Sequence, residues 1–292
     1  KVLPGEVVKI NNNNINKNFN FKINLNNKIN ISKNDAINRL EHLLEESIKK
    51  RLIADVPIGI FLSGGIDSSL IAYYAKKHNN NIKSFTIKMG NDSYDESKYA
   101  KLVADSLSIK NYIAEFDDDA ILQSLNFVES KLDEPLSDPS ILPTFLLSKF
   151  AKEHVKVALS GDGADELFCG YAPFKSINYL KTLSYIPKSI GNMITLIADS
   201  IPTKDSYMSY HFILKHVSRG IGWPSQQQVF RWMAPLSDRN ISNLLSKDFA
   251  FSSNTKNNWD QLFQQELNNK QEITDSLSKM FFDYYLPNDI LT

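Results

Sequence analysis

Short apolar runs alternate with segments of helical period between residues 32 and 159. Four runs are rich in apolar and β-branched side chains and bounded by turn residues, as buried parallel strands are: residues 56–62, 82–88, 111–116 and 155–159. Helices are predicted at residues 68–77, 96–107 and 140–154, with a further helix start at residues 117–119. Residues 32–35 supply caps for an earlier helix, in which Ile37, Leu40, Leu44 and Ile48 recur at helical spacing. This alternation predicts an α/β fold with a parallel, doubly wound sheet.

The two ends of the chain depart from the alternation. Beyond Tyr171 the strand signal fades, and a remainder rich in Tyr, Phe and Leu predicts packed helices. Residues 11–18 form a low-complexity asparagine stretch, and residues 19–31 alternate apolar with polar side chains. We interpret this region as a turn flanked by strand-like segments, a hairpin, with a disordered asparagine-rich tail as the alternative.

A glycine-containing loop, residues 61–69 (FLSGGIDSS), connects the first strand to the next helix. Gly64 and Gly65 allow backbone N–H groups to approach an anion, and the helix N-terminus adds partial positive charge. Asp67 is unfavourable beside bare phosphate but suits a divalent cation held between carboxylate and phosphate. The segment lacks the Gly-Lys-Ser/Thr ending of a Walker A loop. It predicts a phosphate site, with an ordinary Ser-Gly turn as the alternative.

A second polar loop, residues 160–171 (SGDGADELFCGY), follows the strand at residues 155–159. Because open α/β sheets bind ligands at the carboxyl ends of their strands, both loops are predicted to lie at one ligand-binding edge. Asp162, Asp165 and Glu166 have a simpler reading as acids at a turn and helix start, where negative charge is favoured. Three acids among glycines exceed what capping requires.

The chain resembles the synthetase domain of glutamine-hydrolysing asparagine synthetases, members of the N-type ATP pyrophosphatases. The matching segments occur in the family's order, at residues 51–69, 94–100, 132–140, 159–171 and 284–292. The resemblance implies an adenine nucleotide alpha hydrolase-like sheet of about five parallel strands with flanking helices and a helical C-terminal part. It also implies that residues 1–32 are a remnant of a preceding glutaminase domain and linker, and residues 33–292 a synthetase domain truncated at its C-terminus.

The resemblance further implies a role for each matching site residue, with ATP and Mg²⁺ as cofactors. The implied ATP-binding residues are Leu62, Ser63, Gly64, Gly65, Asp67, Ser68, Ile87, Ser160 and Gly161. Within this set the first loop would hold the β- and γ-phosphates, Ile87 would contact adenine, and Ser160 and Gly161 would contact the ribose or α-phosphate side. Asp162 would be the catalytic residue for acyl-adenylate formation, and Asp67 and Asp165 the metal ligands.

The implied activity is an ATP-dependent ligase that adenylates the side-chain carboxylate of aspartate. Ammonia from glutamine, supplied by an N-terminal glutaminase domain, would then give asparagine, AMP and pyrophosphate. Two alternatives stay open: a paralogue acting on another small carboxylate, such as a surface-polysaccharide sugar acid or a β-lactam precursor, and a non-catalytic nucleotide-binding module. A homodimer is compatible with the implied activity and with both alternatives.

The amino-acid composition bears on which kinds of partner and which cellular location are expected. Lys plus Arg and Asp plus Glu both number 33, so net charge gives no reason to expect nucleic acid. One cysteine, Cys169, cannot form an internal disulfide, which favours a cytoplasmic location, and no apolar run is long enough to span a membrane. The family's glutaminase nucleophile is an N-terminal cysteine, whereas this chain starts with Lys1. The family's pyrophosphate-neutralising lysine would lie beyond Thr292, so we expect this stretch alone to be inactive or weakly active.

Overall fold

The computed structural model describes residues 2–11, 14–21, 24, 28–90, 93–133, 136, 138–202, 209–244 and 272–291. It contains two compact units. Ile29–Asp162 forms one unit, and Lys1–Lys28 together with Gly163–Thr292 forms the other. The domain boundary predicted after residue 32 stays a prediction, because spatial compactness does not by itself identify an inherited domain.

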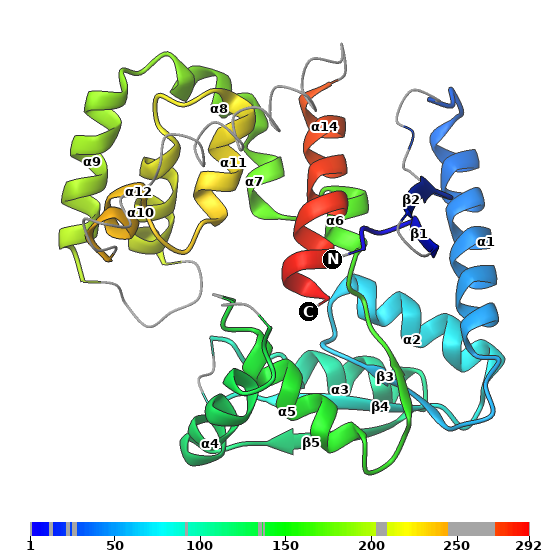
Figure 1. Ribbon diagram of the computed structural model, residues 1–292. Helices are drawn as coiled ribbons and strands as arrows, with labels where there is room; N and C mark the ends of the chain where they lie inside the picture. The colour runs from blue at the N-terminus through cyan, green and yellow to red at the C-terminus, as the bar shows by residue number, and fades with distance from the viewer. Residues whose placement is uncertain are drawn as a thin grey trace. The chain divides into compact units, whose positions relative to one another are not determined.

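The unit Ile29–Asp162 is built on a parallel sheet with helices on both faces (Figure 1). Its strands are β3 (Ile58–Phe61), β4 (Lys83–Lys88), β5 (Lys110–Glu115) and β6 (Val157–Leu159). Its helices are α1 (Lys33–Arg51), α2 (Ile66–His78), α3 (Ser97–Ser106), α4 (Asp118–Glu129) and α5 (Ile141–Ala151). The strand order is β5-β4-β3-β6, and each neighbouring pair is parallel. The predicted doubly wound α/β class is confirmed, with four strands in the described residues where about five were expected.

Alternating side chains of the strands pack on opposite faces of this sheet. Ile58 and Ile60 of β3 belong to a cluster with apolar residues of α1, α2 and α3. On the other face, Phe85 of β4 packs with Ala151 of α5 and with Phe61. Ile60 and Phe85 are completely buried, which contributes about 1.5–3 kcal/mol each. Burial on both faces explains why β3, a central strand, is a continuous apolar run.

Side-chain caps mark the starts of two helices in this unit, α1 and α4. Ser32 Oγ accepts a hydrogen bond from Asp35 N at 3.2 Å, and Asp117 Oδ1 accepts one from Ala120 N at 2.8 Å. Both predicted helix starts are therefore confirmed. Predicted helix boundaries were wrong by up to three residues: α5 ends at Ala151 instead of residue 154, and α2 begins at Ile66, two residues earlier than expected, because extended Gly65 is its N-cap. Asp67 consequently lies in the first helical turn.

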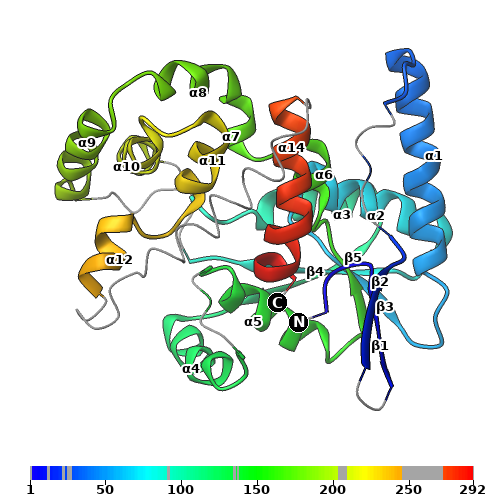
Figure 2. The ribbon, with the colours of Figure 1, turned by 45° about the horizontal axis from the view of Figure 1, so that its top comes forward.

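The second unit contains a hairpin and a set of helices. The hairpin pairs β1 (Glu6–Asn11) with β2 (Asn14–Phe19) in antiparallel register. The helices are α6 (Ala164–Phe168), α7 (Ala172–Lys175), α8 (Ile177–Ser184), α9 (Lys188–Ser200), α10 (Tyr210–Gly220), α11 (Ser225–Met233), α12 (Asp238–Leu244), α14 (Ile273–Met280) and the π-helical segment η2 (Phe281–Ile290). α10 packs against both α9 and α11 (Figure 2). The predicted helical C-terminal part is thus confirmed for the described residues.

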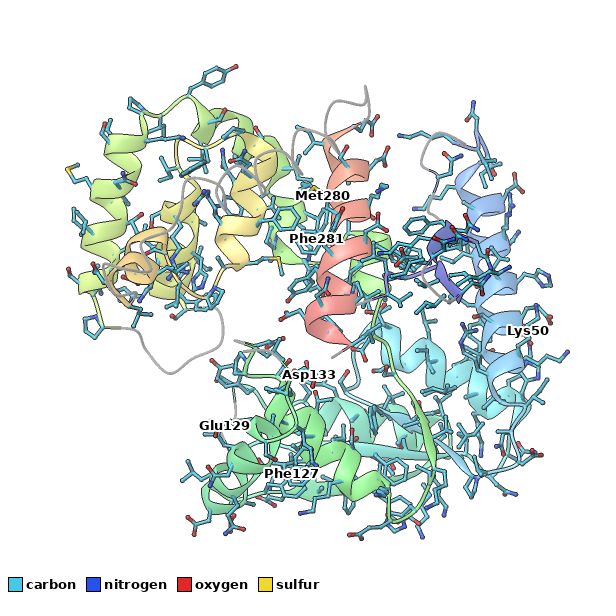
Figure 3. The ribbon with its side chains drawn as sticks, viewed as in Figure 1. Lys50, Phe127, Glu129, Asp133, Met280 and Phe281 are labelled. Atoms are coloured by element: carbon cyan, nitrogen blue, oxygen red, sulfur yellow. The ribbon has the colours of Figure 1, made fainter. Side chains whose placement is uncertain are left out.

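The core of this unit is aromatic. Phe281, labelled in Figure 3 beside Met280, is fully buried and packs with Phe174, Trp232 and Leu277. At the N-terminal end the prediction of a hairpin is confirmed, but its position was wrong. The asparagine stretch itself supplies β2, whereas the described residues after Phe19, including Phe21 and Ile29, are not in strands. Cross-strand pairing therefore overrides the poor strand propensity of asparagine here.

No helix in the described part of the chain has the length and apolar character needed to cross a membrane.

Candidate functional site

The first polar loop leaves β3 through a backbone turn that favours glycine. Gly64 has φ of +83°, in the left-handed region that side-chain-bearing residues avoid. Gly65 then returns to extended geometry as the N-cap of α2. The first N–H groups of α2 have no intrahelical acceptors, so the loop ends at a helix N-terminus suited to an anion.

Two serines hold this loop in shape. Ser63 Oγ lies 3.0 Å from Ser68 Oγ and accepts a hydrogen bond from Gly65 N at 3.2 Å. Ser68 Oγ also accepts from Ser63 N at 3.3 Å and is 3.3 Å from Gly65 O. Ser68 is 6% exposed, so its hydroxyl is largely occupied by the loop's own backbone. The pair therefore preorganises the turn.

The second polar loop lies directly beside the first, because β6 and β3 are neighbouring parallel strands. A Cβ added at Gly161 would lie 3.1 Å from Asp67 Cβ and 3.2 Å from Ser68 N. Ser160 Oγ is 2.6 Å from Asp162 Oδ2, and Asp162 is solvent-accessible. The predicted meeting of both loops at one edge of the sheet is found for the part of the second loop up to Asp162.

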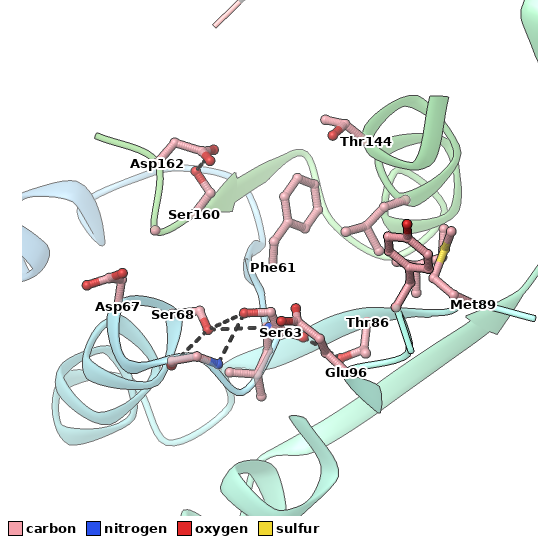
Figure 4. A pocket seen from close by; sticks show the side chains of 16 residues that line it. Phe61, Ser63, Asp67, Ser68, Thr86, Met89, Glu96, Thr144, Ser160 and Asp162 are labelled. Atoms are coloured by element: carbon pink, nitrogen blue, oxygen red, sulfur yellow. Dashed lines mark hydrogen bonds between the residues drawn. The ribbon is translucent and has the colours of Figure 1, made fainter. Parts of the chain in front are cut away.

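A cavity of about 320 Å³ opens between these loops (Figure 4). Nine residues expected from the sequence line it: Leu62, Ser63, Gly65, Asp67, Ser68, Ile87, Ser160, Gly161 and Asp162. Gly64 shapes the loop from behind, where it faces α3. Asp165 belongs to the other compact unit, where it lies in the first turn of α6. The roles of all these expected site residues in ATP binding, metal binding and catalysis stay predictions.

Further lining residues had no predicted role. They are Phe61, Thr86, Met89, Tyr94, Glu96, Thr144 and Leu147. Tyr94 and Glu96 fall inside residues 94–100, one of the segments matched by the family resemblance, which was the available signal for them. Thr86 carried no signal, since a threonine within a strand is ordinary strand chemistry.

Thr86 supports the loop from underneath. It is 2% exposed, and its Oγ1 lies 2.7 Å from Leu62 O and 3.1 Å from Asn111 Oδ1. Ser84 Oγ donates to the same Asn111 oxygen at 3.0 Å. A polar network thus runs from β5 across β4 to the carbonyl that precedes Ser63. Such a network fixes the direction in which the loop leaves the sheet.

Thr86→Val is expected to lower the free energy of unfolding by about 1–3 kcal/mol, because the shape is kept while a buried carbonyl loses a donor. Denaturant unfolding measures the loss. Thr144→Val is the matched control, since Thr144 lines the same cavity but its hydroxyl makes no hydrogen bond to a residue the structure describes. Equal stability of the two variants would show that Thr86 does not support the loop.

Asp67 has the chemistry of a cation ligand at a phosphate site. Its carboxylate lines the cavity and makes no hydrogen bond or ion pair with the described residues. One or two carboxylates together with phosphate oxygens suffice for Mg²⁺, so Asp67 fits that ion. Among the described residues, no group of three His, Cys, Asp or Glu side chains could form an all-protein metal site.

Glu166 of the second loop is hydrogen-bonded to a residue of the aromatic core. Glu166 is 1% exposed and accepts a hydrogen bond from Tyr171 OH at 2.6 Å. Burial, together with this carboxylate, raises the pKa of Tyr171. Cys169 ends α6 in a left-handed conformation, and burial raises the pKa of its thiol. A raised thiol pKa is unfavourable for a nucleophile.

A parallel sheet with a glycine loop at a helix N-terminus and a second polar loop beside it defines a doubly wound α/β protein, and folds of this class bind ligands at that edge of the sheet. Residues 39–292 match the family model described as asparagine synthase. The chain therefore belongs to the asparagine synthase family.

Curated relatives share parts of the sequence. The chain is 36% identical over 160 residues to a putative glutamine-hydrolysing asparagine synthetase of Mycobacterium tuberculosis, covering 55% of this chain and 24% of the relative. It is 32% identical over 207 residues to glutamine-hydrolysing asparagine synthetase 1 of Bacillus subtilis, covering 71% of this chain and 30% of the relative. Amidase chyE of Penicillium rubens is 30% identical over 161 residues, covering 50% of this chain and 24% of the relative. The chain thus spans about a quarter of the length of the mycobacterial relative.

Solved structures resemble the chain more distantly. An NH3-dependent NAD synthetase from Campylobacter jejuni aligns with a TM-score of 0.33 and 15% identity, over 68% of this chain and 97% of that protein. The family assignment rests on the family model and the sequence relatives.

Proposed function

We propose that this chain is the synthetase part of an ATP-dependent ligase that forms asparagine from aspartate. The observation that carries the proposal is the meeting of two glycine loops on one cavity, with Gly161 in contact distance of Asp67 and Ser68. One loop provides backbone N–H groups and a helix N-terminus for phosphates. The apolar side of the cavity, with Phe61, Ile87 and Leu147, suits a flat base. Family membership supports the same activity.

The chemistry explains why both loops are needed. A carboxylate is a poor electrophile, so an oxygen of the aspartate side chain attacks the α-phosphorus of ATP, and the bond to the bridging oxygen breaks to release pyrophosphate. Ammonia then attacks the acyl carbon, AMP leaves with the bonding electrons, and the nitrogen loses a proton. The first step brings two anions together, which requires positioned donors more than acid-base groups. A Mg²⁺ ion held by Asp67 would supply positive charge beside the phosphates.

Further parts of the proposal concern the protein beyond the cavity. Ammonia comes from glutamine through an N-terminal glutaminase domain, and the protein works in the cytoplasm. The named curated relatives at 32–36% identity are described as glutamine-hydrolysing asparagine synthetases, which supports the first of these points. Asp165 as a second metal ligand rests on the family resemblance.

A second candidate is amide formation on a carboxylate other than aspartate. Its support is that the sequence similarity extends to a protein not named as an asparagine synthetase, amidase chyE, over half of this chain. Both loops address the nucleotide, so they serve any activated carboxylate equally well. The lining of the cavity therefore does not discriminate between acceptors.

Pyrophosphate release by the full-length protein tests these proposals. The protein is supplied with ATP, Mg²⁺, ammonia and one acid at a time, from aspartate to sugar acids and β-amino acids. Release with aspartate alone supports asparagine formation, and release with a different acid supports the second candidate. If none of the acids supports pyrophosphate release, the protein is a nucleotide-binding module without ligase activity.

Asp162→Ala is expected to slow acyl-adenylate formation by about 10–100-fold, while the dissociation constant of ATP changes little. The reason is position: the Asp162 carboxylate lines the cavity from the second loop and is anchored by Ser160, rather than by the phosphate loop. Single-turnover assays and nucleotide titration separate the two effects. Asp162→Asn keeps the shape and tests the charge. Loss of ATP affinity with unchanged chemistry would make Asp162 a binding residue instead.

A further inference from the structure

Glu96 presents to the cavity a carboxylate without a partner in the part of the chain that the structure describes. It lines the same cavity as the two loops and keeps access to solvent. Its side chain makes no capping hydrogen bond to α3, and no hydrogen bond or ion pair with any residue that the structure describes. Partial burial raises the pKa of this carboxyl group. An acid in this situation is stabilised by a ligand that donates hydrogen bonds to it.

The neighbouring acid shows the contrast. Asp95 Oδ1 accepts from Ser97 N and Asp95 Oδ2 accepts from Ser97 Oγ, both at 3.0 Å, so Asp95 initiates the turn into α3. Desolvation alone would raise the pKa of Asp95, but these hydrogen bonds, a further one from the Met89 backbone and the charge of Lys88 together outweigh it and lower the pKa. Of the two adjacent acids, Asp95 therefore has a structural task, whereas the Glu96 side chain has no hydrogen-bonding partner among the described residues.

The backbone brings Glu96 to the phosphate loop. Glu96 O accepts hydrogen bonds from Tyr99 N and Ala100 N in the first turn of α3. The same turn packs against Gly64, where an added Cβ would overlap Tyr99 and lie 2.5 Å from Ala100 N. The close approach of α3 to Gly64 thus fixes the position of Glu96 beside the loop.

The order of groups in the cavity indicates what Glu96 faces. In Figure 4 the labelled side chains run from Asp67 and Ser68 through Ser63 and Glu96 to Thr86 and Met89. The side of the cavity with Asp67 and Ser68 suits phosphates, and the opposite side, with Met89, suits a base. A carboxylate repels phosphate oxygens but accepts hydrogen bonds from neutral hydroxyl groups, and its two oxygens can serve two adjacent hydroxyls. The sugar joins phosphate to base and lies at this middle position.

We propose that Glu96 is a nucleoside-recognition residue whose carboxylate accepts hydrogen bonds from the ribose hydroxyls of the bound nucleotide. The cavity then selects ribonucleotides over deoxyribonucleotides. Dinucleotide-binding α/β proteins use an acid after their second strand in the same way, and Glu96 likewise follows β4, the second strand of this sheet along the chain. The inference rests on the nucleotide-dependent function proposed above and adds a determinant of its specificity.

Equilibrium titration of the full-length protein with ATP, 2′-deoxy-ATP, 3′-deoxy-ATP and inosine triphosphate tests the proposal. The wild type is expected to bind ATP roughly tenfold more tightly than either deoxynucleotide, as one hydrogen bond to a charged group predicts. Glu96→Ala should bind all three adenine nucleotides alike, and Glu96→Gln should retain part of the preference. Asp105→Asn is the matched control, because Asp105 lies on the exposed side of α3 outside the cavity. Thermal unfolding of each variant confirms that it is folded.

Each contrary outcome identifies a different error. Unchanged preference for ATP in Glu96→Ala would overturn the role of Glu96 while leaving the proposed function intact. Equal weakening of ATP and both deoxynucleotides would show that Glu96 acts through the cation or the loop instead of the sugar. Loss of discrimination between ATP and inosine triphosphate alone would assign Glu96 to the base. Absence of ATP binding by the wild type would overturn the proposed function itself.

Discussion

Asp67→Asn is expected to reduce pyrophosphate release by about a hundredfold or more, with the fold unchanged. The amide keeps the shape of the side chain but loses the negative charge that we expect to hold Mg²⁺ next to the phosphates. Charge stabilisation of this kind contributes several kcal/mol to a transition state, which corresponds to at least two orders of magnitude in rate. Steady-state pyrophosphate release with ATP, ammonia and aspartate measures the change.

The control for this experiment is Asp119→Asn. Asp67 and Asp119 are each the second residue of a helix, α2 and α4, but Asp119 lies outside the cavity. Both changes remove a favourable charge from a helix N-terminus, which costs about 0.3–1 kcal/mol of stability. Similar unfolding curves with a loss of turnover confined to Asp67→Asn would support the role in cation binding. ATP affinity measured with and without Mg²⁺ adds a second readout, since the variant should lose the enhancement by Mg²⁺. Normal turnover would remove Asp67 from the mechanism.

Gly64→Ala is expected to be the most destabilising single-methyl change at the site. The left-handed backbone costs about 1–2 kcal/mol for a residue with a Cβ. The added methyl would also overlap the backbone of Tyr99 and Ala100, which cannot move without displacing α3. Overpacking adds about 1–3 kcal/mol, so we expect a total loss of roughly 2–5 kcal/mol in the free energy of unfolding. Denaturant unfolding measures this loss.

Gly90→Ala is the matched control for that substitution. Gly90 has no atoms near the position of an added Cβ and does not have a positive φ, so its replacement should change stability little. Because α3 carries Glu96 at its start, Gly64→Ala should also weaken ATP binding in the fraction that remains folded. A Gly64→Ala protein as stable as Gly90→Ala would contradict the close packing of α3 on the loop.

Much of the architecture could be predicted because its causes are local. The apolar runs that became β3, β4, β5 and β6 are bounded by turn residues, and each predicted run overlaps the observed strand. Side-chain caps at Ser32 and Asp117 mark two helix starts within three residues of sequence. The hairpin was predicted at the wrong position because strand pairing depends on a partner segment, and the pairing of β1 with β2 recruits asparagines that disfavour strands in isolation.

The candidate site was predictable where its residues adjoin the two glycine loops, and less so elsewhere. Asp67, Ser68 and Gly161 follow directly from loop chemistry, and the structure places them in contact distance of one another. The location of Ser68 was thus predictable, but the hydrogen bonds of its hydroxyl to Ser63 and Gly65 were not, because no sequence spacing reveals them. Sequence spacing also does not reveal that the Glu96 side chain has no hydrogen bond or ion pair with the described residues, because this depends on which side chains surround it in space.

The sequence by itself determined the alternation of strands and helices, the two polar loops and the glycine positions, because periodicity, capping and turn geometry act over a few residues. Only the tertiary structure decided the strand order β5-β4-β3-β6, and with it the neighbours of each loop. That order places β6 beside β3, so Gly161 meets Asp67, and it places β4 on the other side, so Thr86 reaches Leu62 O. The physical reason is that burial of both sheet faces is a property of the whole unit, satisfied by packing between residues far apart in the chain.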